Sequence, residues 1–406
     1  MGGWKKYHLG ELITDIAAGP FGSNLKISCF VPSGFPIIDG ANLKGFKVTD
    51  NITKFVTEEK ARSMARSIAK RNDVIVTISG TLGQIAYIPE ESEYEEYLCS
   101  QRQFRATFDQ SQVDVPFLVY YFHSHEGQQK ILVYANQVGV PALYQPLKNF
   151  RLIEIALPPL LTQRKIAAVL GALDDKIENN RKICANLEAQ AQAIFKSWFV
   201  DFEPFGGKMP QGWKMGKLGD VAIYRQGKIA ANELTAETYY STENMLPDKQ
   251  GLMPATSLPQ IGEVPVCEKG DVLISNIRPY FKKICFSWSH GGHSPDVLCL
   301  AAKNDNMRYW LYRQLWDDAF FAYVMSSAKG TKMPRGDKEQ ILAYDMAIPT
   351  ENDVARFNAV IEPMCESIVH KGFESRSLAA LRDALLPKLM SGEIDVEKVE
   401  VQEVVK

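Results

Sequence analysis

Asp50, Glu58 and Lys60 have the residue types with which a metal-dependent nuclease holds a metal ion beside a phosphate. Glu58 and Lys60 also belong to the run Glu-Glu-Lys-Ala-Arg at residues 58–62, whose composition is typical of the solvated first turn of a helix. We therefore expect a short helix at residues 58–62, and the nuclease remains the weaker alternative for this segment.

The two histidines of His290-Gly-Gly-His293, flanked by Cys285 and Cys299, have the residue types of a zinc site. The glycines between the histidines are more typical of a hairpin loop, which is the structure we expect here. The chain has seven cysteines and no C-x-x-C pair. We therefore expect reduced, mostly buried thiols and no bound metal.

The sequence motifs of nucleotide and methyl-donor chemistry are missing from the chain. It has no G-x-x-x-x-G-K-[ST] loop for ATP, and no Gly-rich turn between a strand and a helix for S-adenosylmethionine or a dinucleotide. It also lacks the Asn/Asp-Pro-Pro-aromatic tetrad with which amino methyltransferases hold a flipped base. We expect a protein that binds its target without a catalytic centre of its own.

Composition describes an ordinary globular protein of more than one domain. The 406 residues are 46% hydrophobic and 23% charged, and the net charge is −2. Any nucleic-acid-binding surface must therefore come from local clusters of Lys and Arg. No apolar run is long enough to cross a bilayer, and the first residues lack the apolar core of a signal peptide, so we expect a cytoplasmic protein.

The chain repeats itself. Residues 4–12 and 213–221 share the pattern Trp-Lys…Leu-Gly-acidic-aliphatic at an offset of 209 residues. Residues 72–76 and 270–274 match at an offset of 198, and from about 116 to 203 the offset stays at 191. An offset that falls and then becomes constant indicates a duplication whose second copy lost residues in loops.

Each copy has the same internal order of elements. Short β-like runs come first, such as Asp73–Ser79 and Asp271–Ile277. One helical segment follows in each copy, at Pro116–Val133 and at Met307–Met325. After a glycine loop and a short apolar strand, each copy ends in a much longer helical pattern.

The first long helix should run from Pro159 to Phe199, and the second from Thr350, in a capping-box spacing with Asp353, to Ser391-Gly392. In the first helix apolar residues alternate at spacings of three and four, with Asn180 filling one gap, which is a heptad seam. The corresponding positions of the second helix are apolar at the ends and polar in the middle. Two matched seams favour an antiparallel pair of helices about a pseudo-twofold axis, although each helix packing on its own core is the alternative. The seam residues that we select are Leu173, Ile177, Leu187, Ile194, Trp198, Phe199, Ile368, Leu378, Leu385 and Leu389.

The sequence thus predicts an α+β fold: two mixed α/β domains separated by two long antiparallel coiled-coil helices, with a pseudo-twofold internal repeat. The predicted segments are a first domain at residues 1–157, a long helix at 158–200, a Gly- and Pro-rich linker at 201–212, a second domain at 213–349, a second long helix at 350–392 and a tail at 393–406.

Several segments resemble the specificity subunits of type I restriction-modification systems. Two segments resemble the central conserved region of that family. They are residues 156–168, at the start of the first long helix, and residues 195–205 (FKSWFVDFEPF), at its end. Residues 381–392 resemble its C-terminal counterpart. Residues 270–283 are similar to one class of target-recognition domain, and residues 19–25 together with 35–43 to another.

The resemblance implies two target-recognition domains that each read one half of a split double-stranded DNA target across a nonspecific spacer. It implies that the long helices bind two methyltransferase subunits, which restriction subunits then join. S-adenosylmethionine, ATP and Mg²⁺ would act on those partners, with no cofactor bound by this chain. Thr162-Gln163 departs from the usual Glu-Gln, which concerns helix capping. Trp198 and Phe199 are then either seam residues or part of the methyltransferase dock.

DNA is read by polar and basic side chains on loops that reach a groove or the phosphates. Our candidates are Ser23, Asn24, Lys26, Ser79, Thr81, Gln101, Arg102 and Gln103 in the first domain, and Arg225, Lys228, Asn276, Arg278, Lys282, Lys283, Lys329, Lys332 and Arg335 in the second. Tyr280 and Phe281 are either core or base-stacking residues. A coiled-coil adaptor that never touches DNA, and a self-contained site-specific nuclease or methyltransferase, are the alternative functions.

Overall fold

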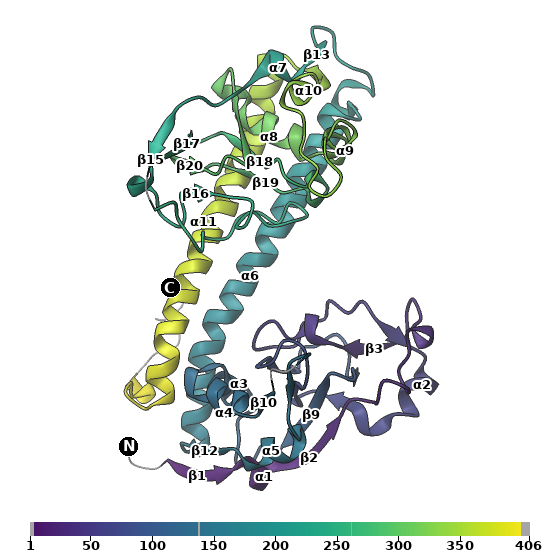
Figure 1. Ribbon diagram of the computed structural model, residues 1–406, viewed down its shortest axis with the longest axis vertical. Helices are drawn as coiled ribbons and strands as arrows, with labels where there is room; N and C mark the ends of the chain where they lie inside the picture. Colours follow the sequence, from purple (N-terminus) through teal and green to yellow (C-terminus); the bar gives the residue numbers. More distant parts are fainter. Residues whose placement is uncertain (1–3, 137–138, 261, 399–406) are drawn as a thin grey trace. The chain divides into compact units, whose positions relative to one another are not determined.

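The computed structural model describes residues 4–136, 139–260 and 262–398 (Figure 1). The chain folds into two compact units: unit 1 is residues 1–179 with 374–406, and unit 2 is residues 180–373. Each unit therefore contains half of both long helices, whereas the sequence analysis set the helices apart from the domains. Among the described residues, no helix is both long enough and apolar enough to cross a membrane.

Unit 1 contains two four-stranded sheets and two strand pairs. The first sheet has the order β2 (Ile13–Ala18), β9 (Gln103–Phe108), β6 (Val74–Thr77) and β7 (Ile85–Tyr87), and the second has β4 (Phe55–Val56), β3 (Phe35–Ile38), β8 (Glu96–Cys99) and β5 (Ile68–Lys70). β1 (Lys5–His8) pairs with β12 (Glu154–Leu157), and β10 (Ala135–Asn136) with β11 (Ala142–Leu143). Strand β6 is entirely buried: Val74 and Val76 face one hydrophobic cluster and Ile75 faces another, as the two-residue period of a strand requires.

Unit 2 repeats the strand order of the first of these sheets. Its sheets have the orders β14 (Ala222–Tyr224), β21 (Val297–Ala302), β18 (Val272–Ser275), β19 (Ile284–Phe286) and β15 (Lys228–Ala230), β17 (Glu263–Cys267), β20 (Gly291–His293), β16 (Tyr239–Tyr240). β13 (Lys214–Lys217) pairs with β22 (Asp345–Ile348), as β1 pairs with β12. The order β14-β21-β18-β19 matches β2-β9-β6-β7 strand for strand, which confirms the duplication.

The prediction of one helix in the middle of each copy is wrong, because each copy has two. They are α3 (Val115–His123) and α4 (His125–Leu132) in unit 1, and α8 (Arg308–Trp316) and α9 (Asp318–Ser326) in unit 2. Ser124 and Asp317 take extended backbone angles and cap the second helix of each pair, Ser124 by accepting from the Gly127 amide and Asp317 from Ala319. A Cβ on Gly127 would lie 2.2 Å from the Tyr121 carbonyl oxygen, so only glycine allows α4 to turn back so closely on α3.

The remaining short helices also occur in pairs. α1 (Leu9–Leu12) and α5 (Pro146–Leu152) in unit 1 correspond to α7 (Leu218–Val221) and α10 (Lys338–Leu342) in unit 2. α2 (Glu58–Arg62), capped by Thr57, is the helix expected at residues 58–62. The hairpin loop expected at His290–His293 is wrong: Gly291 to His293 form strand β20, and a Cβ on Gly291 would collide with the Thr238 carbonyl beside it.

The prediction of two long helices is confirmed. They are α6 (Leu160–Phe199) and α11 (Glu351–Met390). Asp353 donates its amide to the Thr350 hydroxyl, as a capping box requires. In unit 1, Asp174 of α6 pairs with Arg382 of α11 and Lys176 with Glu374. In unit 2, Cys184 of α6 contacts the Ile368 carbonyl and Phe195 packs against Phe357. In both units the residue number rises on one helix as it falls on the other, so the pair is antiparallel.

The predicted seam residues lie between the helices or against the domains, and burial is highest toward the helix ends. Leu173, Phe199 and Leu389 are buried, and the other seven are partly buried. Phe195, which we did not select, is fully buried in the core of unit 2.

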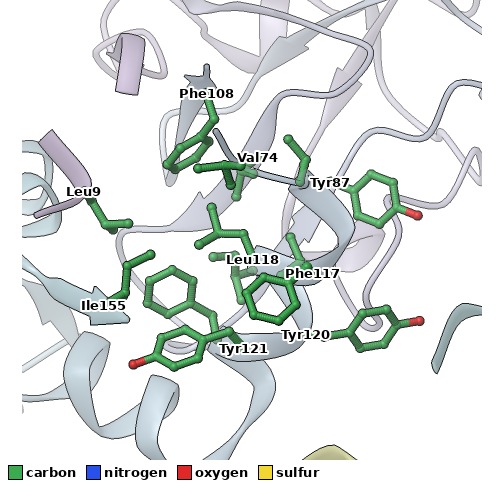
Figure 2. Packing of buried hydrophobic residues seen from close by; sticks show 14 of the residues in the cluster. Leu9, Val74, Tyr87, Phe108, Phe117, Leu118, Tyr120, Tyr121 and Ile155 are labelled. Atoms are coloured by element: carbon green, nitrogen blue, oxygen red, sulfur yellow. The ribbon is translucent and has the colours of Figure 1, made fainter. Parts of the chain in front are cut away.

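The main core of unit 1 lies between its first sheet and the helices. Figure 2 shows Val74 and Phe108 from the sheet, Phe117 and Leu118 from α3, and Leu9 from α1 packed together. α6 and α11 contribute further residues to this cluster, and Val396 of the predicted tail is buried in it too. Residues 399–406 of the tail lie outside the described residues.

The corresponding core of unit 2 is rich in aromatic rings. Phe199 stacks on Trp213 at a ring-centroid distance of 5.3 Å and meets Phe357 edge-on at 4.9 Å. Trp198 packs on Phe357 and on Phe205 of the predicted linker. In this structure Trp198 and Phe199 are therefore packing residues of unit 2.

Candidate nucleic-acid interface

In unit 2, the loop that leaves the central strand β18 meets the glycine loop that follows α9. Ile277 forms an isolated β-bridge with Arg335, and the Arg278 amide donates to the Pro334 carbonyl at 2.8 Å. Because these contacts join residues far apart in the sequence, one surface collects seven of our candidates. They are Asn276, Arg278, Lys282, Lys283, Lys329, Lys332 and Arg335, which we call the unit 2 loop cluster.

The same two loops meet in unit 1. Ser79, just after β6, forms a bridge with Ala142, and the Gly80 amide donates to the Pro141 carbonyl at 2.9 Å. The Ile78 amide donates to the Arg102 carbonyl, which brings the turn before β9 to the same place. The duplicated topology thus places candidate loops at the equivalent end of the central sheet in both units.

The Gly-rich turn at residues 19–26 joins this surface of unit 1. The Gly19 amide donates to the Gln103 carbonyl at 2.8 Å, and a Cβ on Gly22 would lie 2.6 Å from the Gln101 side-chain oxygen. The exposed candidates of the unit 1 loop cluster are Ser23, Asn24, Lys26, Thr81, Gln101 and Arg102, and Ser79 is partly buried.

Three candidates lie elsewhere or point inward. Gln103 is 1% exposed and its side-chain oxygen accepts from the Ser100 hydroxyl, so it shapes the turn rather than presenting a polar group to solvent. Arg225 is held by two hydrogen bonds, at 2.8 and 2.6 Å, to the buried Asp271, which precedes β18 at the opposite end of that strand. Lys228 lies on β15 beside Glu263. Neither Arg225 nor Lys228 belongs to the unit 2 loop cluster.

Acidic neighbours orient several cations of the unit 2 loop cluster. Lys329 pairs with Asp337 at 2.6 Å, and its ammonium group lowers the pKa of that carboxyl. Arg335 pairs with Asp296 at 2.9 Å. Lys332 is exposed and makes no ion pair with the described residues, so its charge is available to a phosphate.

Two aromatic residues whose placement the sequence left open prove to be exposed. Tyr280 is 48% exposed and Phe281 is 38% exposed, within the unit 2 loop cluster. Phe21, which we did not select, is 83% exposed in the turn at residues 19–26 of unit 1. A large aromatic inside a polar turn is the sequence signal that could have identified Phe21.

The zinc and nuclease alternatives receive no support from this geometry. His290 contacts Glu268, and buried His293 contacts the Ser294 carbonyl. In the part of the chain that the structure describes, no three His, Cys, Asp or Glu side chains are grouped to hold a metal ion.

The first half of the chain matches a known family model. Residues 1–189 match the type I restriction modification DNA specificity domain. Over 373 residues the chain is 25% identical to the type I restriction enzyme MjaIX specificity subunit of Methanocaldococcus jannaschii, covering 85% of this chain and 82% of that protein. These matches make the chain similar to type I specificity subunits, over its first half in the family model and over most of its length in the M. jannaschii subunit.

Other specificity subunits are also similar to this chain. The HindI specificity subunit of Haemophilus influenzae is 25% identical over 262 residues, which is 63% of this chain and 53% of that subunit. The crystal structure of a type I system S subunit from M. genitalium has a TM-score of 0.64 at 16% identity, covering 95% of this chain and 96% of that one. The likeness confirms the predicted fold class.

In both units, polar contacts tie each pair of short helices to the long helices of the same unit. In unit 1, the Tyr120 hydroxyl of α3 donates to Asp174 of α6, which also pairs with Arg382 of α11. In unit 2, the fully buried Arg313 of α8 pairs with Glu188 of α6 and contacts Cys365 of α11. These contacts fix how each unit holds its loop cluster relative to its half of the helix pair.

Proposed function

We propose that this chain is the DNA-recognition subunit of a type I restriction-modification complex, in which each unit reads one half of a split target. The observation that carries the proposal is the duplicated loop cluster, because both units gather polar and basic loops at the equivalent end of the central sheet. Loops of this composition suit contacts to base edges and phosphates. A reader with two similar units suits a target with two half-sites.

The long helices are proposed to bind two methyltransferase subunits, which restriction subunits then join. Exposed apolar side chains on them support a docking role, namely Leu161 on α6 and Val360 and Leu381 on α11, which are 40–63% exposed. Because the chain lacks the motifs for these reactions, S-adenosylmethionine, ATP and Mg²⁺ are assigned to the partners, and the chain itself to a non-catalytic role.

The test is reconstitution with the methyltransferase encoded beside this chain. We expect sequence-specific, salt-sensitive DNA retention and methyl transfer only when both proteins are present. Assembly without DNA retention would favour the adaptor alternative, and cleavage or methylation by the chain alone would favour the self-contained enzyme.

The substitution Lys332→Ala tests the electrostatic part of the interface. If Lys332 neutralises one phosphate, its loss should lower the slope of log K against log salt concentration by about 0.9 without changing the preferred sequence. The measurement is DNA affinity of the reconstituted complex across a salt series. Lys214→Ala, which removes an exposed lysine of β13, is the matched control and should leave the slope unchanged. An unaltered slope for Lys332→Ala would place Lys332 away from DNA.

A further inference from the structure

The unit 2 loop cluster presents two aromatic rings to solvent side by side. Tyr280 and Phe281 follow the buried Pro279 in a single 3₁₀ turn, Pro279–Phe281. Their ring centroids lie 4.7 Å apart, and neither ring belongs to a hydrophobic cluster of the unit. We call Tyr280 and Phe281 the aromatic pair.

The backbone around the aromatic pair is strained on both sides. Arg278 before it has a φ of 51° and Lys282 after it a φ of 50°, values in the left-handed region that non-glycine residues rarely adopt. Asp248 and Lys249, on the neighbouring segment, have φ values of 53° and 60°. Strain of this kind persists only where the surrounding contacts impose it, and it is concentrated at functional sites.

Contacts from three other segments impose this conformation. Asp248 donates its amide to the Phe281 carbonyl at 2.8 Å, and Lys249 to the Lys282 carbonyl at 3.1 Å. The Arg278 amide is fixed to the Pro334 carbonyl. The side chains of Lys249 and Lys282 both pair with Asp318 at the start of α9. The rings are therefore carried on a rigid turn, which keeps them exposed.

Cationic residues flank the aromatic pair along the chain. Arg278 precedes it and Lys282 and Lys283 follow it, and the exposed Lys332 lies on the adjoining glycine loop. The Asp318 carboxylate is shared between Lys249 and Lys282. The Nε atom of Arg278 is buried without a hydrogen-bond partner among the described residues. The order along the chain is a cation, two aromatic rings and further cations. This order suits DNA in which a stacked base step lies between two phosphates.

We propose that the aromatic pair inserts at one base step of the half-site read by unit 2 and partly unstacks it. Apolar side chains that enter a base step unstack and kink the duplex, and neighbouring cations hold the phosphates on each side. A rigid turn suits this task, because a ring on a mobile loop would move aside instead of separating the stacked bases. The inference rests on the proposed function, since it needs a DNA half-site facing unit 2.

The experiment places 2-aminopurine, a base analogue whose fluorescence rises on unstacking, at successive positions of that half-site. The sample is the full chain assembled with its methyltransferase. On binding, we expect the fluorescence of 2-aminopurine to rise at one base step. In Phe281→Ala this rise should disappear, and DNA affinity should fall about ten- to hundredfold. Phe281→Leu, which keeps an apolar side chain, should restore part of both. Ile223→Ala, which shortens a 46% exposed side chain on β14, should leave both unchanged.

The outcomes separate this inference from the proposed function. Suppose that the complex binds its target specifically, but that 2-aminopurine fluorescence rises at no position, or only at a position where it also rises in Phe281→Ala. The proposed insertion of the aromatic pair is then overturned, and the recognition function stands. A rise that persists in Phe281→Ala reports a base moved by the methyltransferase instead. If the unsubstituted complex shows no sequence-specific binding, the proposed function itself fails.

Discussion

Replacing Arg313 by methionine is expected to lower the free energy of unfolding of unit 2 by about 3–5 kcal/mol, the usual cost of removing one partner of a buried ion pair. Arg313 is 0% exposed, and its guanidinium joins α8 to Glu188 on α6 and to Cys365 on α11. Without the arginine, the Glu188 carboxylate, whose side chain is 27% exposed, loses this ion-pair partner. The loss should therefore include both the broken contacts and an unpaired carboxylate.

The measurement is denaturant unfolding of the full chain, followed by tryptophan fluorescence. The double variant Arg313→Met with Glu188→Met should recover part of the loss, because two apolar side chains leave no unpaired charge. Arg382→Met is the comparison variant in unit 1: Asp174 would keep the Tyr120 hydroxyl as a hydrogen-bond donor, so a smaller loss is expected. A loss below about 1 kcal/mol for Arg313→Met would show that the pair behaves like a surface ion pair.

Exchanging the recognition part of unit 1 for that of another family member is expected to change one half-site and leave the other intact. Each unit has its own sheets, core and loop cluster, so one set of loops can change without the other. Methylation of the original target should fall by about 10³-fold or more, the usual gap between specific and non-specific DNA binding. Methylome sequencing of the hybrid measures this, and new sequences in both half-sites would contradict independent reading.

The structure also sets where the exchange should end. Tyr120 bonds Asp174, and Lys47 pairs with Asp175 at 2.8 Å, so unit 1 depends on residues within the first half of α6. A hybrid joined near Asn179 should keep these contacts. One joined at Leu157 keeps them only if the donor supplies the same partners, and it should otherwise be less stable. Equal stability of the two hybrids would show that these contacts contribute little.

Much of this protein follows from local pattern. Both long helices, the Thr350 cap of the second, and the strands around Val74 and Val272 were predictable, because heptad spacing, capping residues and buried apolar runs are properties of neighbouring residues. The duplication was predictable from the repeat in the sequence. The exposed loops of both clusters were also predictable, since Gly-rich polar segments rarely fold inward.

Only the tertiary structure decided which loop residues share a surface. Gln103 and Arg102 are adjacent in the sequence, yet one is buried and the other exposed, because Arg102 lies in the turn before β9 whereas Gln103 begins this buried strand and accepts from the Ser100 hydroxyl. Arg225 is held by Asp271, 46 residues away, which no local pattern indicates. The exposure of Tyr280 and Phe281 likewise depends on Asp248, Pro334 and Asp318, contacts that form only when distant segments meet. Local periodicity fixes an element's type and face, whereas the neighbours of a loop are fixed by the packing of the whole unit.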